Sequence, residues 1–224
     1  MKRLLLINPN TSEPITRKLA DCARERLGNR FEVQAITARF GSSYISSEVS
    51  LAVAQHSVVD AYQWAVEQGT QPHVILIGCF GDPGLFALKE MANCPVLGLA
   101  EASMRAASVR GPFSIVTGGA AWKQPLERLA FSIGLHSQLR GIETVEASGA
   151  ELAADPTGAK RILLEACRTA SQPILSGKQR PLSLILGGAG LLGMAQDLAP
   201  HLTVPVLDSV HCALDAVASA LATA

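Results

Sequence analysis

The chain has no excess of charge of either sign and few aromatic residues. Nineteen Lys and Arg residues balance nineteen Asp and Glu residues, and Phe, Trp and Tyr make up 4% of its 224 residues. A balanced charge argues against a nucleic acid or an anionic membrane as the main partner. Scarce aromatic side chains argue against a surface that stacks bases. We therefore expect a small-molecule ligand.

Long hydrophobic runs are also absent. In the opening stretch MKRLLLINPN the apolar run ends at Ile7, which is too short for the core of a signal peptide. No run approaches the roughly 20 residues of a membrane span. We therefore expect a cytoplasmic protein whose thiols are reduced. The cysteines, which show no framework spacing, are Cys22, Cys79, Cys94, Cys167 and Cys212.

Several motifs of cofactor chemistry are missing. The sequence has no CxxC, no HExxH and no histidine cluster, so no metal site is indicated. It has no GxxxxGK[ST] phosphate loop, and no GxGxxG follows the first apolar run. A nucleotide-binding function is therefore disfavoured.

Short apolar runs alternate with longer segments of helical periodicity. This alternation predicts an α/β protein with mainly parallel sheets. The runs that we expect to be strands are RLLLIN, FEVQAIT, HVILIG, CPVLGLA, FSIVTG, GIETVEA, LSLILGG and VPVLDS. One helix is expected to begin in DPGLFALKEM, with Asp82 as its cap and Pro83 at its first position.

The two halves of the chain resemble each other. LLLIN at 4–8 matches FSIVT at 113–117, ILIGCFG at 75–81 matches LILGGAG at 184–190, and CPVLGL at 94–99 matches VPVLDS at 204–209. The offset stays at 109 to 110 residues. We predict two pseudo-symmetric Rossmann-like units, residues 1–98 plus 209–224 and residues 99–208, with the active site in the cleft between them.

Polar or glycine-rich loops follow four of the expected strands. They are NPNTS, GCFGDPG, TGG and GGAGLLG, and each precedes an expected helix, where free N–H groups favour an anionic oxygen. We expect a pocket for a small carboxylate, imide or enolate. Cys79 lies in the second loop. A lone cysteine is often only packing, but a helix start would lower its thiol pKa and suit it to removing a proton next to a carbonyl.

The motifs INPNTS, GCFGDPG, PVLGLAEA, FSIVT, LGGAGL and VPVLDSV together resemble the aspartate/glutamate/hydantoin racemase superfamily, and among its branches the hydantoin and allantoin racemases. The resemblance implies two similar α/β domains, no cofactor, homo-oligomers, and a small hydantoin, ureide or amino-acid-like substrate. It also implies two cysteines that face each other across the substrate and move its α-proton. Cys79 matches the first of them.

The chain departs from this pattern at the second cysteine, where it has Gly188. Three interpretations follow. Another group replaces the missing thiol, with His211, Asp208 and Cys212 as candidates and His211 preferred because its pKa suits the task. Alternatively, Cys79 works alone, as in a single-cysteine decarboxylase or isomerase. In the third interpretation the protein only binds a small molecule.

The remaining candidates are expected to bind the substrate. Asn8 and Thr11 would bond substrate oxygens through their side chains, and Ile45 would line the pocket from the loop at 41–48. The others, which would offer backbone groups or match these loops by pseudo-symmetry, are Phe80, Gly81, Thr117, Gly118, Gly188, Ala189 and Gly190.

Overall fold

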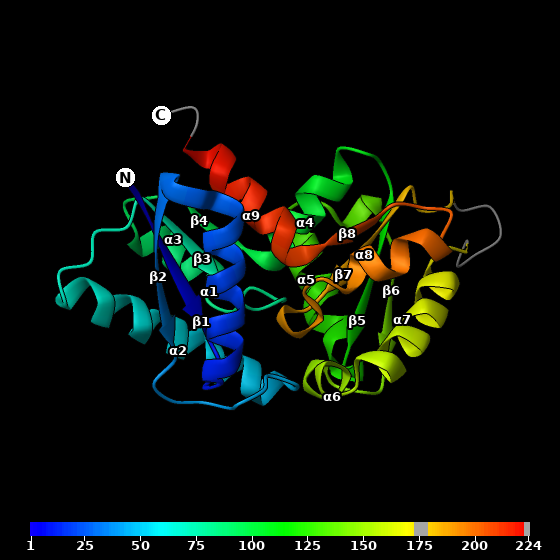
Figure 1. Cartoon of the computed structure of the whole chain (residues 1–224), viewed down its shortest axis with the longest axis horizontal. Coiled ribbons are helices and arrows are strands. Elements are labelled where there is room, and N and C mark those ends of the chain that lie inside the picture. Colours follow the sequence, from blue (N-terminus) through cyan, green and yellow to red (C-terminus); the bar gives the residue numbers. More distant parts are fainter. Residues whose placement is uncertain (173–178, 222–224) are drawn as a thin grey trace. The chain divides into compact units, whose positions relative to one another are not determined.

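The computed structural model describes residues 1–172 and 179–221 of the chain. The chain forms two compact units. Unit 1 is Met1–Leu99 together with the C-terminal residues from Ala213 onward, and unit 2 is Ala100–Cys212. Figure 1 labels the elements of both.

Each unit contains one four-stranded sheet in which all neighbouring strands are parallel. The strand orders, β2-β1-β3-β4 and β6-β5-β7-β8, are the same topology. This arrangement confirms the predicted α/β class. The strands are β1 (Lys2–Asn8), β2 (Phe31–Thr37), β3 (Val74–Ile77), β4 (Val96–Gly98), β5 (Phe113–Gly118), β6 (Leu139–Val145), β7 (Ser183–Gly187) and β8 (Val206–Asp208).

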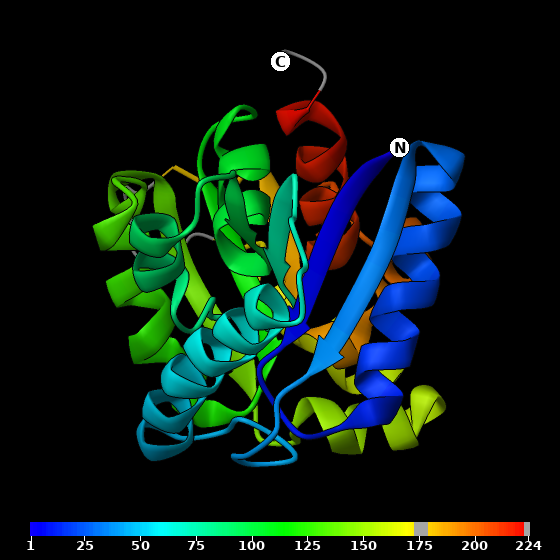
Figure 2. The ribbon, with the colours of Figure 1, turned by 90° about the vertical axis from the view of Figure 1, so that its left-hand side faces the viewer.

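Helices connect the strands and cover the sheets. In unit 1, α1 and α2 lie on opposite faces of the sheet (Figure 2). The helices are α1 (Glu13–Leu27), α2 (Glu48–Glu67), α3 (Leu85–Met91), α4 (Leu99–Ser108), α5 (Lys123–Ser132), α6 (Gly149–Ala154), α7 (Pro156–Ala170), α8 (Met194–Leu198) and α9 (Ser209–Ala220). None of the helices within the described ranges is long and apolar enough to cross a membrane.

The strand registers reproduce the internal repeat. In unit 1 Ile77 pairs with Gly98, and in unit 2 Leu186 pairs with Asp208. The first and third strands of the two units therefore correspond at an offset of 109 residues, and the fourth strands at 110. By this register Cys79, two residues after Ile77, corresponds to Gly188.

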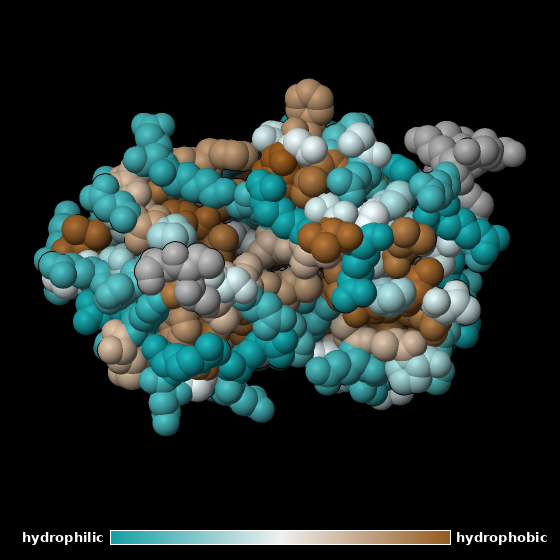
Figure 3. Space-filling model, turned by 90° about the horizontal axis from the view of Figure 1, so that it is seen from above, coloured by the Kyte–Doolittle hydropathy of each residue, from teal (hydrophilic) through white to brown (hydrophobic). Residues whose placement is uncertain are grey.

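Buried aliphatic side chains explain why the short apolar runs form central strands. All four residues of β3 and all five of β7 are buried, as expected for strands that are covered on both faces. On the face shown in Figure 3, hydrophobic side chains form separate patches between hydrophilic ones.

One predicted helix start is wrong. The helix expected from Asp82 begins only at Leu85, and its N-cap is Gly84 in the left-handed conformation, with φ +75°. The sequence Asp-Pro looks like a cap followed by a first helical residue, but here it belongs to a turn in which the Leu85 N–H donates to the Asp82 carbonyl at 3.1 Å.

Candidate active site

Cys79 lies at the carboxyl end of β3, one of the two central strands of its sheet. The preceding residue, Gly78, donates its N–H to the carbonyl of Ile7 at 2.8 Å and so continues the pairing of β3 with β1. The Cys79 residue is only 8% exposed. Its place at this edge of the sheet is where open α/β sheets bind ligands.

The expected lowering of the Cys79 pKa is wrong. Burial raises the pKa of this thiol well above its ordinary value, and the nearby charge of Asp82 raises it further. The helix start that was expected to lower the pKa, at Asp82, is not there, because α3 begins only at Leu85, six residues after Cys79. Near neutral pH the side chain is therefore a neutral thiol.

The turn that follows Cys79 leaves backbone donors available. The Asp82 N–H closes this turn on the Cys79 carbonyl at 3.1 Å. Within the described ranges, no hydrogen-bond acceptor is assigned to the N–H groups of Phe80 and Gly81. Two successive N–H groups beside a thiol are suited to hold a developing oxyanion. The Phe80 side chain itself is buried.

The loop after β1 is held by Asn8 rather than left open. The buried amide nitrogen of Asn8 donates to Asn10 Oδ1 at 2.9 Å, to the Ser12 carbonyl at 3.1 Å and to Thr16 Oγ1 at 2.9 Å. Its Oδ1 accepts from the Asn10 N–H at 3.3 Å. The predicted substrate-binding side chain Asn8 is thus occupied by contacts within unit 1.

Asn10 is a candidate that the sequence analysis missed. Its Oδ1 accepts from Asn8 and from the Ser12 N–H, whereas its amide nitrogen has no hydrogen-bond partner among the residues that the structure describes. The residue is buried, like Asn8. The motif NPNTS contains both asparagines, but the sequence alone does not show which side-chain amide forms hydrogen bonds within the protein and which one is left for a ligand.

Two further contacts fix this loop against the chain that leads into α2. The Thr11 N–H donates to the Ser42 carbonyl at 3.1 Å, and Ser57 Oγ donates to the Pro9 carbonyl at 2.9 Å. Ile45, predicted to line the pocket, is 3% exposed. Because Ile7 pairs with Ile77, Asn8 and Cys79 follow the ends of neighbouring parallel strands and lie at the same edge of the sheet of unit 1, where the loop with Thr11 also begins.

In unit 2 the predicted loop residues form a closely packed backbone. Thr117 Oγ1 donates to the Gly187 carbonyl at 2.8 Å, and Gly188 donates its N–H to Ser209 Oγ at 3.2 Å. A Cβ on Gly118 or Gly190 would lie under 3.0 Å from backbone oxygens. Glycine is therefore required there by close packing. Ala189 begins a short 3-10 helix.

Asp208 and His211 lie at the start of α9. The Asp208 carboxylate accepts from the N–H groups of Gly193 at 2.8 Å, Val210 at 2.9 Å and His211 at 3.1 Å. It therefore caps the start of the helix. His211 is half-buried, and its ring has no hydrogen-bond partner among the described residues. Cys212 is also half-buried.

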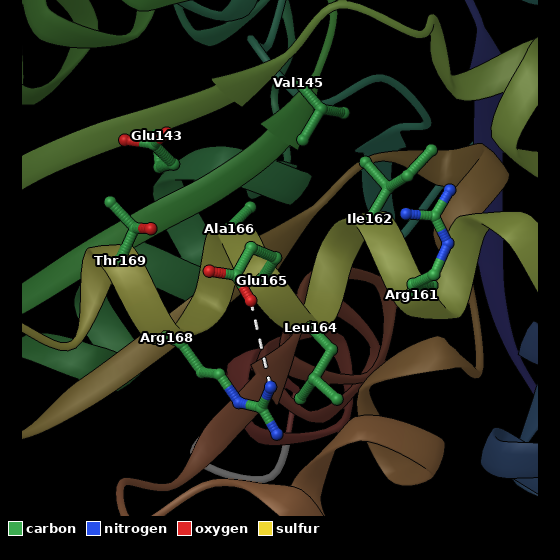
Figure 4. A pocket seen from close by; sticks show the side chains of 9 residues that line it. All are labelled: Glu143, Val145, Arg161, Ile162, Leu164, Glu165, Ala166, Arg168 and Thr169. Carbon is green, nitrogen blue, oxygen red and sulfur yellow. Dashed lines mark ion pairs between the residues drawn. The ribbon is translucent and has the colours of Figure 1, made fainter.

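The described residues contain no group of three or more His, Cys, Asp or Glu side chains that could hold a metal ion. A groove of about 450 Å³ lies on unit 2 between β6 and α7. It contains an ion pair between Arg168 and Glu165 at 3.8 Å (Figure 4). None of the predicted site residues lines it.

Comparison with known proteins agrees with the fold and the motifs. The model of the Asp/Glu/Hydantoin racemase family matches residues 4–217. A hydantoin racemase of Paenarthrobacter aurescens is 33% identical over 94% of this chain and 87% of its own length. An allantoin racemase structure from Klebsiella pneumoniae has a TM-score of 0.86 and 31% identity, and the match covers 100% of this chain and 89% of that one. One from Pseudomonas fluorescens has the same TM-score and 26% identity, with 99% and 91% covered.

Both the repeated α/β architecture and the matches along nearly the whole chain lead to the same assignment. The chain belongs to the Asp/Glu/hydantoin racemase family and is an isomerase of that family.

Proposed function

We propose that this enzyme moves a proton at the carbon next to a carbonyl of a small hydantoin, ureide or amino-acid-like substrate, with Cys79 as the acid/base. The observation that carries the proposal is the buried Cys79 thiol beside the unoccupied N–H groups of Phe80 and Gly81. The thiol exchanges the proton while the two N–H groups bind the oxygen of the enolate. The amide nitrogen of Asn10 is a further donor for a substrate oxygen.

The protonation state of Cys79 determines how the rate depends on pH. The neutral thiol can donate a proton to the enolate directly, whereas removal of the α-proton from the substrate requires the thiolate. Because burial and Asp82 raise the pKa of Cys79, the thiolate fraction grows about tenfold with each pH unit below that pKa. Exchange of the α-proton is therefore expected to rise with pH across the neutral range.

Racemisation needs a second acid/base on the other face of the enolate. We assign this role to His211, because histidine is the side chain that most often transfers protons in enzymes. Its backbone is fixed by the cap that Asp208 forms, and its ring has no partner among the described residues that would hold its proton. The names of the relatives, hydantoin racemase and allantoin racemase, support ring ureides as the first substrates to test.

The test follows both hands of a 5-substituted hydantoin separately in D2O. Polarimetry reports inversion, and the NMR signal of the α-hydrogen reports exchange. We expect both hands to lose optical rotation and to exchange their α-hydrogen. Cys79→Ser abolishes both signals. His211→Asn abolishes inversion but leaves exchange of one hand. Cys94→Ser, at a half-buried cysteine without a proposed role, is the matched control.

Gly188 favours a second candidate function, in which Cys79 acts alone. Glycine offers no proton at the position that corresponds to Cys79. If one hand exchanges while its rotation persists, the enzyme protonates a single face, and the reaction is that of a single-cysteine decarboxylase or isomerase. If no ureide, malonate or maleate exchanges or reacts but one of them binds, the protein is a binding protein and the proposal is wrong.

We also propose that the chain forms a homo-oligomer. The α2 helix supplies exposed apolar side chains, among them Val49, Val53 and Val66. Light scattering on the purified protein measures the molar mass. A mass of one chain at micromolar concentration would contradict this assembly.

A further inference from the structure

The two units can be compared position by position at the loop that follows the third strand. The register shows that Gly98 at the end of β4 corresponds to Asp208 at the end of β8. Gly84 and Gly193 also correspond, and each is a left-handed glycine that precedes a short helix. The two loops, residues 79–84 and 188–193, are thus the same structural element in two units.

In unit 2 a carboxylate ties this loop to the fourth strand. It comes from the strand, where Asp208 accepts the N–H of Gly193 at 2.8 Å. The same carboxylate accepts from Val210 and His211. Asp208 is 7% exposed, so its carboxylate is largely shielded from water, whereas two of its three donors, Gly193 and His211, are half-buried.

In unit 1 the corresponding residue is a glycine, and the carboxylate comes from the loop. A Cβ built on Gly98 would overlap all three atoms of the Asp82 carboxylate. The backbone of Gly98 lies outside the left-handed region, so its conformation does not demand glycine. The Asp82 side chain is what excludes a side chain at this position.

Asp82 also has an unusual backbone. With φ +50°, it is the one residue other than glycine with positive φ in the described part of the chain. Such a conformation costs free energy and persists where surrounding contacts fix it, and Asp tolerates it better than most residues. The residue is 4% exposed, and its N–H closes the turn on the Cys79 carbonyl.

We propose that Asp82 is a positioning residue for Cys79, because its carboxylate anchors the loop 79–84 at Gly98. In unit 2 the corresponding anchor of the loop 188–193 is Asp208, whose carboxylate comes from the fourth strand instead of the loop. The catalytic importance of this anchor rests on the proposed role of Cys79. The anchor itself is tested by the reactivity of the thiol, which requires no substrate turnover. Burial and the negative charge of Asp82 both keep the Cys79 pKa raised, and Asp82 is the charged group among the described residues that reaches this thiol.

The first experiment exchanges the two residues. Asp82→Gly removes the carboxylate and keeps a residue that accepts positive φ, whereas Gly98→Asp places two carboxylates in one space. The double variant recreates in unit 1 the arrangement of unit 2. The readout is the rate at which iodoacetamide alkylates Cys79, measured by mass spectrometry of its peptide.

We expect each single variant to alkylate at least about tenfold faster than the unmodified protein, because a released loop exposes the thiol. The double variant should return to within about threefold, which is a strong departure from additivity. If the double variant is no slower than the single variants, or if Asp82→Gly alkylates at the unmodified rate, the anchor is refuted.

The second experiment separates charge from shape. Asp82→Asn keeps the shape and tolerates the backbone, so it should move the pH profile of Cys79 alkylation to lower pH and make the reaction about tenfold faster at a fixed pH near neutral. The matched change Asp208→Asn in unit 2 should leave the profile in place. Equal profiles for Asp82→Asn and the unmodified protein would refute the effect of charge. If the alkylation rates change as expected but no substrate is turned over, only the proposed function is refuted, and the anchor stands.

Discussion

Replacing Asp208 with alanine is expected to destabilise the protein by about 3 to 4 kcal/mol. The magnitude follows from the three backbone N–H groups that its carboxylate accepts, at 2.8, 2.9 and 3.1 Å. Val210 is 1% exposed, so its N–H finds no water after the change and contributes about 2 kcal/mol. Gly193 and His211 are half-buried and can be rehydrated, so each contributes about 1 kcal/mol.

The assay is urea unfolding, followed by circular dichroism and tryptophan fluorescence at constant pH. The control is Asp197→Ala in the same unit, which removes a half-exposed ion pair with Lys160 and should cost under about 1 kcal/mol. If both variants unfold at the same urea concentration, the carboxylate is not the anchor that its hydrogen bonds indicate. If Asp208→Ala instead abolishes exchange of the substrate's α-hydrogen while the urea midpoint is unchanged, Asp208 is a reacting group.

Three more outcomes follow from the same structure. Asn8→Ala should cost about 2 to 4 kcal/mol in urea unfolding, because its buried amide nitrogen holds three acceptors; a change below about 1 kcal/mol would contradict this role. Gly188→Ala should cost more than about 1 kcal/mol, since φ is +142° there, and an unchanged midpoint would contradict it. Burial raises the pKa of Cys167 to about 12, so this thiol should resist iodoacetamide at pH 8 until the chain is unfolded in urea; rapid alkylation of the folded protein would show that the thiol is not buried.

The fold was predictable because its signals are local and repeated. Each strand is a short apolar run between polar loops, and the runs recur at an offset that the strand registers reproduce. One helix was missed although its signal was present. The Ser148 and Glu151 side chains form a capping box at the start of α6, in a stretch that the sequence analysis passed over.

The candidate site was predictable only in part, because its chemistry depends on contacts that are distant in sequence. Cys79 was singled out by its position after an apolar run. The direction of its pKa shift was not, since burial and the true start of α3 decide it. Likewise, Asp82 looked like a helix cap next to Pro83, whereas it packs against Gly98, sixteen positions along the chain on another strand.

The loops of the two units differ by more than one side chain. In unit 1 the thiol of Cys79 lies near a buried carboxylate; in unit 2 a Cβ at Gly188 would lie 3.3 Å from Leu191 Cγ, on a backbone with φ +142°. A second thiol at Gly188 would thus require both a strained backbone and displacement of Leu191. The backbone of unit 2 is therefore adapted to the absence of a side chain at this position. For the racemisation proposed above, the second acid/base would then come from another element, and this is the physical reason to test His211 on α9 before any change at Gly188.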